Sequence, residues 1–283
     1  MNATSTTSTT NAAERHSLGV TTSASSQRRD LRLALRQIGF EQRAFWRNRT
    51  RAFFSVGLPL MFLVVFNALN GGHRIDELGG ISYATWFVPG ILAYGLMMAT
   101  FSNLAVSVTV ARDTGVLKRI RGTSLPTWVY IAGRVGSTVI TAATLVAATL
   151  GLGVTVYGVH LRAATVPGLL ATLVLGSVCF TVLGLAITAA IPNAEAAPAI
   201  VNLVLLPLTF VSGIWMVLTD APSWLDVTAK IFPVRAFAHG LQHAFHPATT
   251  GTGIVGTDLM VLAIWTLVGL RVCQRWFRWE TRR

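Results

Sequence analysis

Long apolar runs recur along the chain, and each is close to the length that a helix needs to cross a lipid bilayer. A helix rises about 1.5 Å per residue, so about 20 apolar residues cover a hydrocarbon core of about 30 Å. Short polar stretches separate the runs. We expect six membrane-spanning helices, which cover about residues 53–70, 86–110, 135–157, 168–190, 199–218 and 254–273.

The composition agrees with a membrane protein rather than a soluble domain. Only 12% of the 283 residues are charged and 52% are hydrophobic, whereas soluble domains carry about 25% charged residues. The formal net charge of +12 raises nucleic-acid binding as an alternative. Because the basic residues lie beside the apolar runs, we interpret them as a topology signal and expect no nucleic acid as a partner.

Lys and Arg residues also predict how the chain is oriented. Nineteen of the 23 lie before residue 52, within residues 111–134, or from Arg271 onward, and four lie in the other connections. Cytoplasmic loops carry the excess of basic residues, so both termini and residues 111–134 are predicted to be cytoplasmic. The Ala- and Arg-rich, Lys-poor composition favours a bacterial source. We therefore expect a multi-pass protein of a bacterial inner (plasma) membrane.

The N-terminal region divides into a polar tail and a basic helix. Residues 1–30 are rich in Ser, Thr and Ala, so we expect a disordered cytoplasmic tail before a transmembrane domain at 31–283. In residues 31–50, apolar side chains recur at helical spacing between arginines, which predicts an amphipathic helix in the headgroup region. Its candidate interfacial residues are Arg36, Arg43, Trp46 and Arg47.

Motifs for catalysis or nucleotide binding are absent from the sequence. Neither Lys118 nor Lys230 is followed by Ser or Thr, so no phosphate-binding G-x-x-x-x-G-K-[ST] loop exists. No C-x-x-C, H-E-x-x-H or G-x-S-x-G motif occurs either. The apolar runs lack a relay of charged residues, which argues against a proton-driven carrier. We expect a non-enzymatic chain with no catalytic residue and no bound cofactor, powered by a partner.

Three histidines gather in the stretch "HGLQHAFH". His239 and His243 are four residues apart, so they share a helix face, and His246 lies just beyond. They are either metal ligands or polar residues at the external interface. The sequence supplies no further ligands or supporting residues, so we predict no metal site.

The stretch "VARDTGVLKRIRGTSLPTWVYIAGR", residues 110–134, resembles a cytoplasmic loop of the ABC-2 type transporter permeases. In that family an R/E-x-G-[TV]-L-[KE]-R-[LI]-x-x-[ST]-P-L-like run precedes Y-x-x-G-[RK]. The matching positions are Arg112, Gly115, Leu117, Arg119, Leu125, Pro126, Tyr130, Gly133 and Arg134. Asp113 keeps the family's acidic residue, whereas Ser124-Leu125-Pro126 departs from the usual Ser/Thr-Pro-Leu order.

A second stretch, residues 205–241, is similar to the family's fifth span and the external segment after it. The match is carried by Pro207, Leu208, Phe210, Ser212, Gly213, Pro222, Trp224, Leu225 and Pro233. Residues 219–246 are too short and too often interrupted by Pro to cross the membrane and return. We expect a short re-entrant external helical segment between spans five and six, with Pro222, Trp224, Leu225 and Pro233 as its marker residues.

The resemblance covers about residues 31–280 and is greatest to the drug-exporter branch, typified by daunorubicin-exporter permeases. It implies two permease chains, as a homodimer or with a sister permease, and two cytosolic ABC ATPase chains that bind ATP and Mg. The 111–126 loop would dock on the ATPase together with the N-terminal helix. The candidate coupling residues are Arg112, Asp113, Gly115, Leu117, Lys118, Arg119, Arg121 and Pro126. The alternative is that these basic residues only set topology.

The predicted fold is thus an all-α integral membrane protein, a six-helix bundle with an N-terminal amphipathic interfacial helix and a re-entrant external segment. The predicted function is the permease subunit of an ATP-driven exporter that moves an amphipathic drug-like or lipid-linked molecule out of the cytoplasm. Soft apolar side chains on spans two and five are the candidate path, with bundle packing or lipid contact as the alternative. They are Met97, Met98, Phe101, Phe210, Trp215 and Met216. The alternative functions are a polysaccharide- or glycolipid-export permease and a non-transporting membrane anchor for a cytosolic partner.

Overall fold

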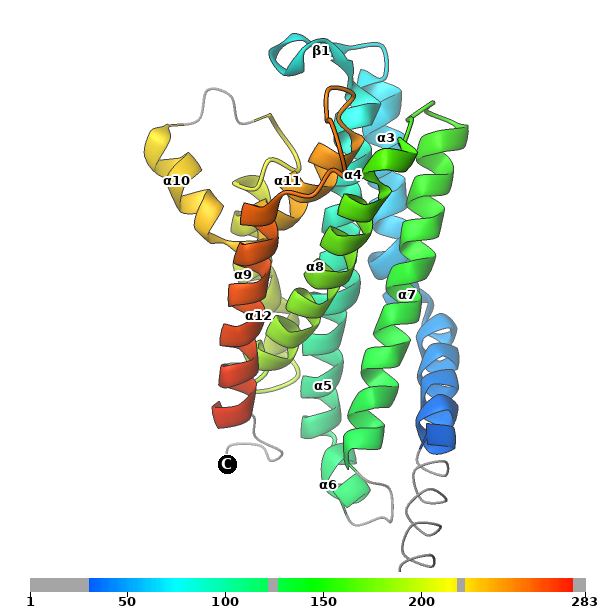
Figure 1. Cartoon of the computed structure of the whole chain (residues 1–283). Coiled ribbons are helices and arrows are strands. Elements are labelled where there is room, and N and C mark those ends of the chain that lie inside the picture. Colours follow the sequence, from blue (N-terminus) through cyan, green and yellow to red (C-terminus); the bar gives the residue numbers. More distant parts are fainter. Residues whose placement is uncertain (1–30, 122–126, 218–221, 277–283) are drawn as a thin grey trace, which may run out of the picture.

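A computed structural model of the chain describes residues 31–121, 127–217 and 222–276. Long helices run side by side in Figure 1, with a small β-hairpin at one end and the short helix α6 (Val116–Arg121) at the other. We call these the hairpin end and the α6 end. The described C-terminal residues and the helix at residues 31–47 also lie toward the α6 end.

The first half of the chain builds two long helices joined by the hairpin. After the helix at 31–47, one continuous helix joins α2 (Arg49–Ala52), the π-helix η1 (Phe53–Gly57) and α3 (Leu58–Asn70). Strands β1 (Arg74–Ile75) and β2 (Ile81–Ser82) pair antiparallel around the 3-10 turn η2 (Asp76–Leu78). The second helix joins α4 (Tyr83–Met97), the π-helix η3 (Met98–Ser102) and α5 (Asn103–Asp113).

The second half is helical in all its described regular elements. They are α6, α7 (Thr127–Thr155), the 3-10 turn η4 (Ala163–Thr165), α8 (Val166–Ile187), α9 (Ala196–Phe210), α10 (Ser223–Ile231), α11 (Pro233–Phe245) and α12 (Gly256–Trp276).

Five helices in the described part are long and apolar enough to cross a membrane. They are Arg49–Asn70, Tyr83–Asp113, Ala132–Thr155, Ala163–Ile187 and Gly256–Trp276. The predicted all-α membrane architecture is confirmed at this level, with two short strands added at one end.

The fifth predicted span, at 199–218, corresponds to the shorter helix α9. It has 15 residues and ends at Phe210, so it is about 22 Å long, less than a hydrocarbon core of about 30 Å. The apolar run continues, but the chain turns at Val211–Gly213, and Gly213 has a positive φ of 79° that ends the helix. The six-span count therefore stays a prediction.

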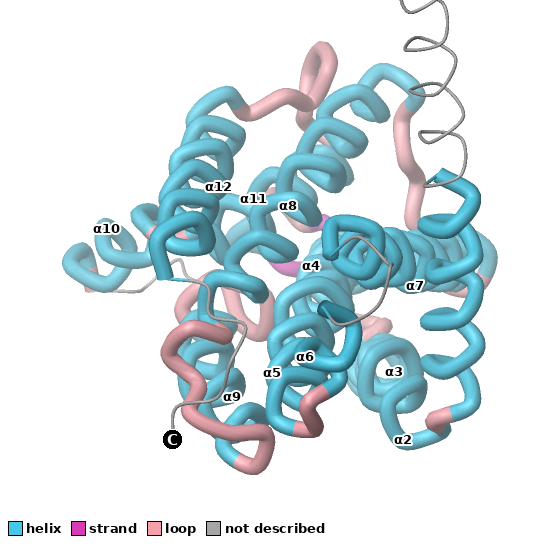
Figure 2. Tube along the Cα trace, turned by 90° about the horizontal axis from the view of Figure 1, so that it is seen from below, coloured by secondary structure: helices cyan, strands magenta, loops and turns pink. Residues whose placement is uncertain are grey.

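The Tyr83–Asp113 helix lies at the centre of the bundle. In Figure 2, which views the molecule from the α6 end, α4 and α5 lie between α3, α7, α8 and α9. Of the most apolar part of this helix 78% is buried, compared with 17% for Gly256–Trp276. Small residues permit the close packing: a Cβ on Gly184 of α8 would lie 2.7 Å from the carbonyl oxygen of Phe101.

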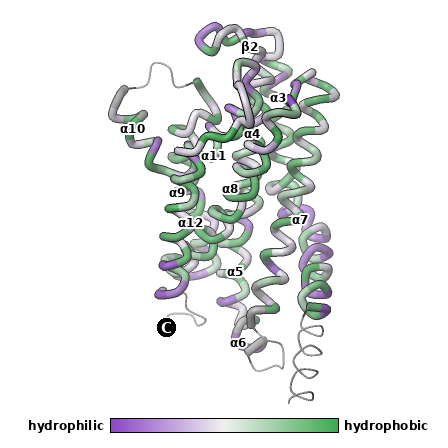
Figure 3. Tube along the Cα trace, viewed as in Figure 1, coloured by the Kyte–Doolittle hydropathy of each residue, from purple (hydrophilic) through white to green (hydrophobic). Residues whose placement is uncertain are grey.

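The residues along the middle of the bundle are largely hydrophobic, as the colours of Figure 3 show, and many apolar side chains of the outer helices are exposed. Leu203 on α9 is 73% exposed and Leu267 on α12 is 63% exposed. In water such a surface would be a large unfavourable apolar patch. A hydrocarbon environment removes that cost, which agrees with the membrane assignment.

Candidate functional sites at the two ends of the bundle

The predicted coupling loop begins where the central helix ends. α5 ends at Asp113, Gly115 adopts a φ of 70°, and α6 starts at Val116. The backbone N–H of Arg119 donates to the carbonyl of Gly115 at 3.0 Å, which closes the first turn of α6. Because glycine has no Cβ, it adopts this left-handed conformation at little cost. Gly115 therefore forms the turn between the two helices.

Two basic side chains of this loop are accessible. Lys118 and Arg119 are exposed on α6, and Figure 1 places that helix at the tip of the bundle. The side chains of Leu117 and Arg121, and the whole of Pro126, lie outside the described residues. Within the described part of the loop, Lys118 and Arg119 are thus the charged groups placed to contact a partner.

Arg112 and Asp113 are held by their own chain instead. The Arg112 side chain is 8% exposed, and its Nη1 and Nη2 donate to the carbonyls of Thr188 at 2.9 Å and Ile191 at 2.6 Å. Asp113 lies 3.7 Å from this guanidinium and accepts a hydrogen bond from the N–H of Ala194. Arg112 was predicted among the residues of the loop that docks on the ATPase, and that role stays a prediction. The acceptors here are backbone atoms 76 and 79 residues away, which no sequence motif marks.

The N-terminal helix at 31–47 packs along α7. A Cβ on Gly133 would lie 2.3 Å from a side-chain carbon of Gln37, and one on Gly136 would lie 2.5 Å from Ile38. Gln42 Nε2 donates to the carbonyl of Ser137 at 2.8 Å. The two glycines, three residues apart on α7, thus leave the space that receives this helix.

An ion pair fixes the same contact. Glu41 lies 3.7 Å from Arg134, whose Nε donates to the hydroxyl of Tyr130 at 3.0 Å. Burial raises the pKa of Tyr130 above its usual value, while Arg134 acts in the opposite direction. Sequence reasoning included Tyr130 and Arg134 in the family motif but missed Glu41 as their partner.

The predicted interfacial side chains lie on the remaining surface of the N-terminal helix. Arg36, Arg43, Trp46 and Arg47 are all exposed. Arg36, Arg43 and Arg47 are spaced by seven and four residues, so they share one face. Exposed Leu31 and Leu35 lie with Trp46 on a neighbouring face. An arginine face beside an apolar face suits a helix at the lipid headgroups, and this role stays a prediction.

The six candidate path residues do not form one surface in this structure. Met97 and Phe101 are 0% and 5% exposed in the core, and Met98 packs against it. Phe210 and Met216 are 52% and 53% exposed. Met98 and Phe101 belong to the π-helix η3 inside the central helix, a feature that recurs at functional sites. Their role in a path stays a prediction.

Trp215 lies at the centre of an aromatic cluster near the hairpin end. Its ring centroid lies 5.1 Å from that of Tyr94 and 5.4 Å from that of Phe62. Phe66, Phe87 and Phe210 also lie within 6.5 Å of it. The segment after α9 thus packs against α3 and α4. The indole Nε1 of Trp215 is buried and has no hydrogen-bond partner.

The segment between α9 and α12 forms the two helices α10 and α11. On α10, Trp224 is 67% exposed, Pro222 is exposed and Leu225 is partly buried. Pro233 is the first residue of α11 and one of nine buried residues among the 13 of that helix. α11 packs on α4, α8 and α12. A short re-entrant helical segment was expected here, and the structure has two helices. Whether they enter the membrane stays a prediction.

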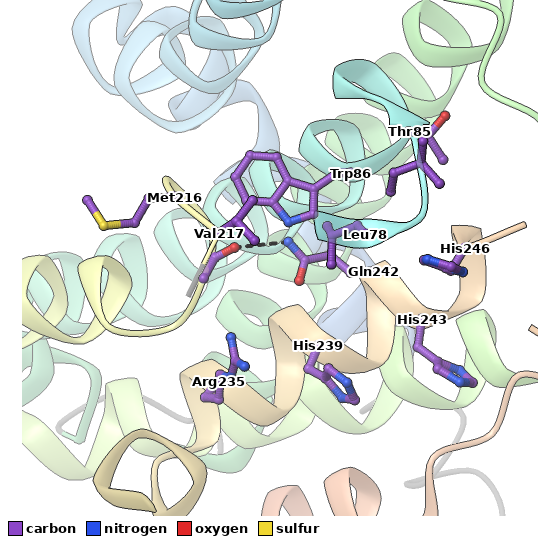
Figure 4. A pocket seen from close by; sticks show the side chains of 12 residues that line it. Leu78, Thr85, Trp86, Met216, Val217, Arg235, His239, Gln242, His243 and His246 are labelled. Atoms are coloured by element: carbon purple, nitrogen blue, oxygen red, sulfur yellow. Dashed lines mark hydrogen bonds between the residues drawn. The ribbon is translucent and has the colours of Figure 1, made fainter. Parts of the chain in front are cut away.

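A cavity of about 240 Å³ lies between α11, the hairpin, the start of α4 and the segment after α9. Figure 4 shows Arg235, His239 and His243 along α11 and His246 just after its end, with Thr85 and Trp86 of α4 across from them. Gln242 Nε2 donates to the carbonyl of Gly213 at 3.0 Å and joins the two walls. The cavity thus has polar and apolar walls, as ligand pockets have.

The rings of His239 and His243 have centroids 6.1 Å apart, and His239 and His246 each make a polar contact. His239 Nδ1 lies 2.7 Å from Asp258 Oδ2, which links α11 to α12. His246 Nδ1 accepts from the N–H of Ala248 at 3.2 Å. No group of three or more His, Cys, Asp or Glu residues in the described ranges is arranged to hold a metal ion.

Comparisons with known proteins point to one family. Residues 38–246 match the family described as ABC-2 type transporter. "Inner membrane transport permease YadH" of Escherichia coli (strain K12) is 25% identical over 220 residues, which cover 75% of this chain and 84% of that protein. "Daunorubicin resistance ABC transporter permease protein DrrB1" of Streptomyces coeruleorubidus is 29% identical over 213 residues, which cover 73% of this chain and 72% of that protein.

These matches confirm the resemblance inferred from residues 110–134 and 205–241. They agree with the apolar helices and support a multi-pass protein of the inner membrane. Because the family match covers residues 38–246 of 283, the chain belongs to the ABC-2 type transporter family, the membrane permease subunits of ABC transporters that associate with a separate ATPase subunit.

Proposed function

We propose that this chain is the permease of an ATP-driven exporter that moves an amphipathic drug-like or lipid-linked molecule out of the cytoplasm. The observation that carries the proposal is α6, which presents Lys118 and Arg119 to the surroundings directly after the most buried helix of the bundle. A push on α6 therefore acts on the core of the permease. A cytosolic ATPase that binds ATP and Mg supplies that push.

The proposed orientation places the α6 end in the cytoplasm. Exposed basic residues gather there on α6, on the 31–47 helix and at the end of α12, which fits the positive-inside rule. In this proposal α9 is the fifth of six spans, and the bilayer adapts to its short length. The exposed apolar face of α9 then contacts a second permease chain, with the path between the two chains.

The cargo class is inferred from two features. The relative of 29% identity is named as a daunorubicin resistance permease. The exposed Phe210 and Met216 provide adaptable apolar surface at the hairpin end of α9, and the cavity beside Met216 adds polar groups. Together they suit a molecule with an apolar body and polar substituents.

The first test is co-purification of the full chain with the ATPase encoded beside it. The double variant Lys118→Glu/Arg119→Glu is expected to reduce the recovered ATPase at least about tenfold, because charge reversal opposes an acidic partner surface. The matched control is Arg271→Glu/Arg275→Glu, an exposed basic pair at the same end, which should retain the ATPase. Membrane insertion of both variants is checked by membrane fractionation.

The outcomes separate the proposal from its rivals. Equal binding by wild type and the α6 variant would mean that these charges set topology only. A complex whose ATPase does not respond to daunorubicin as a probe, but responds to a lipid-linked oligosaccharide, would favour polysaccharide or glycolipid export. A complex without nucleotide-driven transport of any probe would favour a membrane anchor.

A further inference from the structure

Arg112 carries a buried positive charge at the last turn of the central helix. A charged side chain that is 8% exposed is costly unless its donors are matched. Its two terminal nitrogens reach the carbonyls of Thr188 and Ile191, and Nη2 also lies 3.4 Å from the carbonyl of Pro192. Its Nε faces Asp113 Oδ1 at 3.7 Å, and neither atom has a hydrogen-bond partner in the described part of the chain. The contacts with the carbonyls are specific, because the planar guanidinium donates in fixed directions.

The acceptors all belong to the connection between α8 and α9. Thr188 is the C-terminal cap of α8, where unpaired carbonyls favour a cation. Asp113 binds the same connection by accepting a hydrogen bond from the N–H of Ala194. Asn193 Oδ1 accepts from the N–H of Ala196, the first residue of α9, at 2.8 Å. The end of α5 is therefore joined to both the end of α8 and the start of α9.

The same two residues are adjacent to α6. Only Thr114 and Gly115 separate Asp113 from Val116, the first residue of α6. α9 buries a single stripe in this chain, made of Ala197, Val201, Leu205 and Thr209. The connection that Arg112 and Asp113 bind therefore holds the start of α9, while the Trp215 cluster holds the chain beyond its end.

We propose that Arg112 and Asp113 are positioning residues that transmit movement of α6 to α9 by holding the 188–194 connection to the end of α5. This inference rests on the proposed function, since it assumes that an ATPase moves α6. It assigns the two residues to coupling within the permease, whereas Lys118 and Arg119 act in binding the ATPase.

The test follows α9 directly and needs no known cargo. Asn202, an exposed polar residue of α9, is replaced by Cys in a Cys179→Ala/Cys273→Ala background. The permease–ATPase complex is reconstituted in nanodiscs, and the rate of maleimide labelling at residue 202 is measured without nucleotide and with ATP and vanadate. The measured quantity is the ratio of the two rates, together with the amount of bound ATPase and its rate of hydrolysis.

In the chain with Arg112 and Asp113 intact, ATP and vanadate are expected to change the labelling rate at residue 202. Arg112→Gln and Asp113→Asn should each reduce that change at least about tenfold, within the usual range of coupling free energies, while bound ATPase and basal hydrolysis persist. Arg112→Lys should retain only part of it, because a single ammonium nitrogen cannot take the places of both Nη1 and Nη2, which reach Thr188 and Ile191 separately. The matched control is Arg162→Gln, which removes a donor to the carbonyl of Thr249 at the hairpin end and should leave the ratio unchanged.

Each outcome decides the inference. If Arg112→Gln and Asp113→Asn both keep the nucleotide-dependent change in labelling rate, Arg112 and Asp113 do not transmit the movement, while the proposed function stands. If they lose the bound ATPase, they act in docking and the inference is overturned. If Arg112→Gln fails to insert, the isosteric Asp113→Asn gives the result. A wild-type chain that binds no ATPase contradicts the proposed function instead.

Discussion

The two ends of the bundle are both fastened by arginines that donate to loop carbonyls, but their surroundings differ. At the α6 end, Arg112 is buried beside Asp113, and together they hold the 188–194 connection. At the hairpin end, Arg162 donates to Thr249 at 3.2 Å, and a neighbouring cavity of about 240 Å³ remains open. Charged side chains hold the first contact, whereas the aromatic rings around Trp215 contribute to packing near the second.

This difference suggests that the two ends have different mechanical roles. The hydrogen bonds from the charged Arg112 side chain to backbone carbonyls are short and directional. The α6 end is therefore suited to transmit movement as a rigid unit. Aromatic packing permits several arrangements of similar energy. The hairpin end is therefore suited to rearrange around a ligand.

The largest effect is expected for Gly168→Val at the hairpin end. A Cβ at Gly168 would lie 2.3 Å from the backbone of Gly253, and the Gly168 N–H donates to the carbonyl of Thr252 at 2.9 Å. The loop must move and lose this bond, for an expected destabilisation of about 3 kcal/mol or more. The check is thermal unfolding in detergent. Gly151→Val, with nothing within 4 Å of its Cβ, is the control, and equal losses in both would contradict the close contact.

Replacing Trp215 should have the next largest effect. Trp215→Ala removes the ring that contacts Tyr94, Phe62 and Phe210, and should destabilise the chain by about 2–3 kcal/mol, less than for a fully buried ring. Trp215→Phe keeps an aromatic ring and removes the buried unpartnered Nε1, so its stability should stay within about 1 kcal/mol of wild type. Unfolding midpoints of the two variants measure this, and equal midpoints would refute the role of the ring.

The sequence predicted the membrane class and the family well because both depend on local signals. Apolar runs report burial in lipid along a single helix, and the residues of the 110–134 loop are contiguous in the chain. The contacts of Arg112 and the pairing of Glu41 with Arg134 were missed because their partners are distant in sequence. The end of α9 at Phe210 was missed because hydropathy stays high through the turn at Gly213.

The smallest stability effect is expected for Gly115→Ala at the α6 end. Nothing lies within 4 Å of a Cβ at Gly115, so no clash arises, but its φ of 70° is unfavourable for alanine. The expected cost is about 1–2 kcal/mol. Gly115→Asn should cost less, because asparagine adopts this conformation more readily. Unfolding midpoints rank the three chains as Gly, Asn, Ala.

Gly115→Ala and Gly115→Asn also test whether the two ends differ in their effect on ATPase binding. Strain at Gly115 acts between α5 and α6, whereas Gly168 lies far from α6. Co-purification with the ATPase should therefore decrease in Gly115→Ala more than in Gly115→Asn, following the stability order. If the two variants bound the ATPase equally and as well as wild type, the direction that Gly115 gives to α6 would have no part in docking. The coupling surface would then reduce to the exposed charges of Lys118 and Arg119.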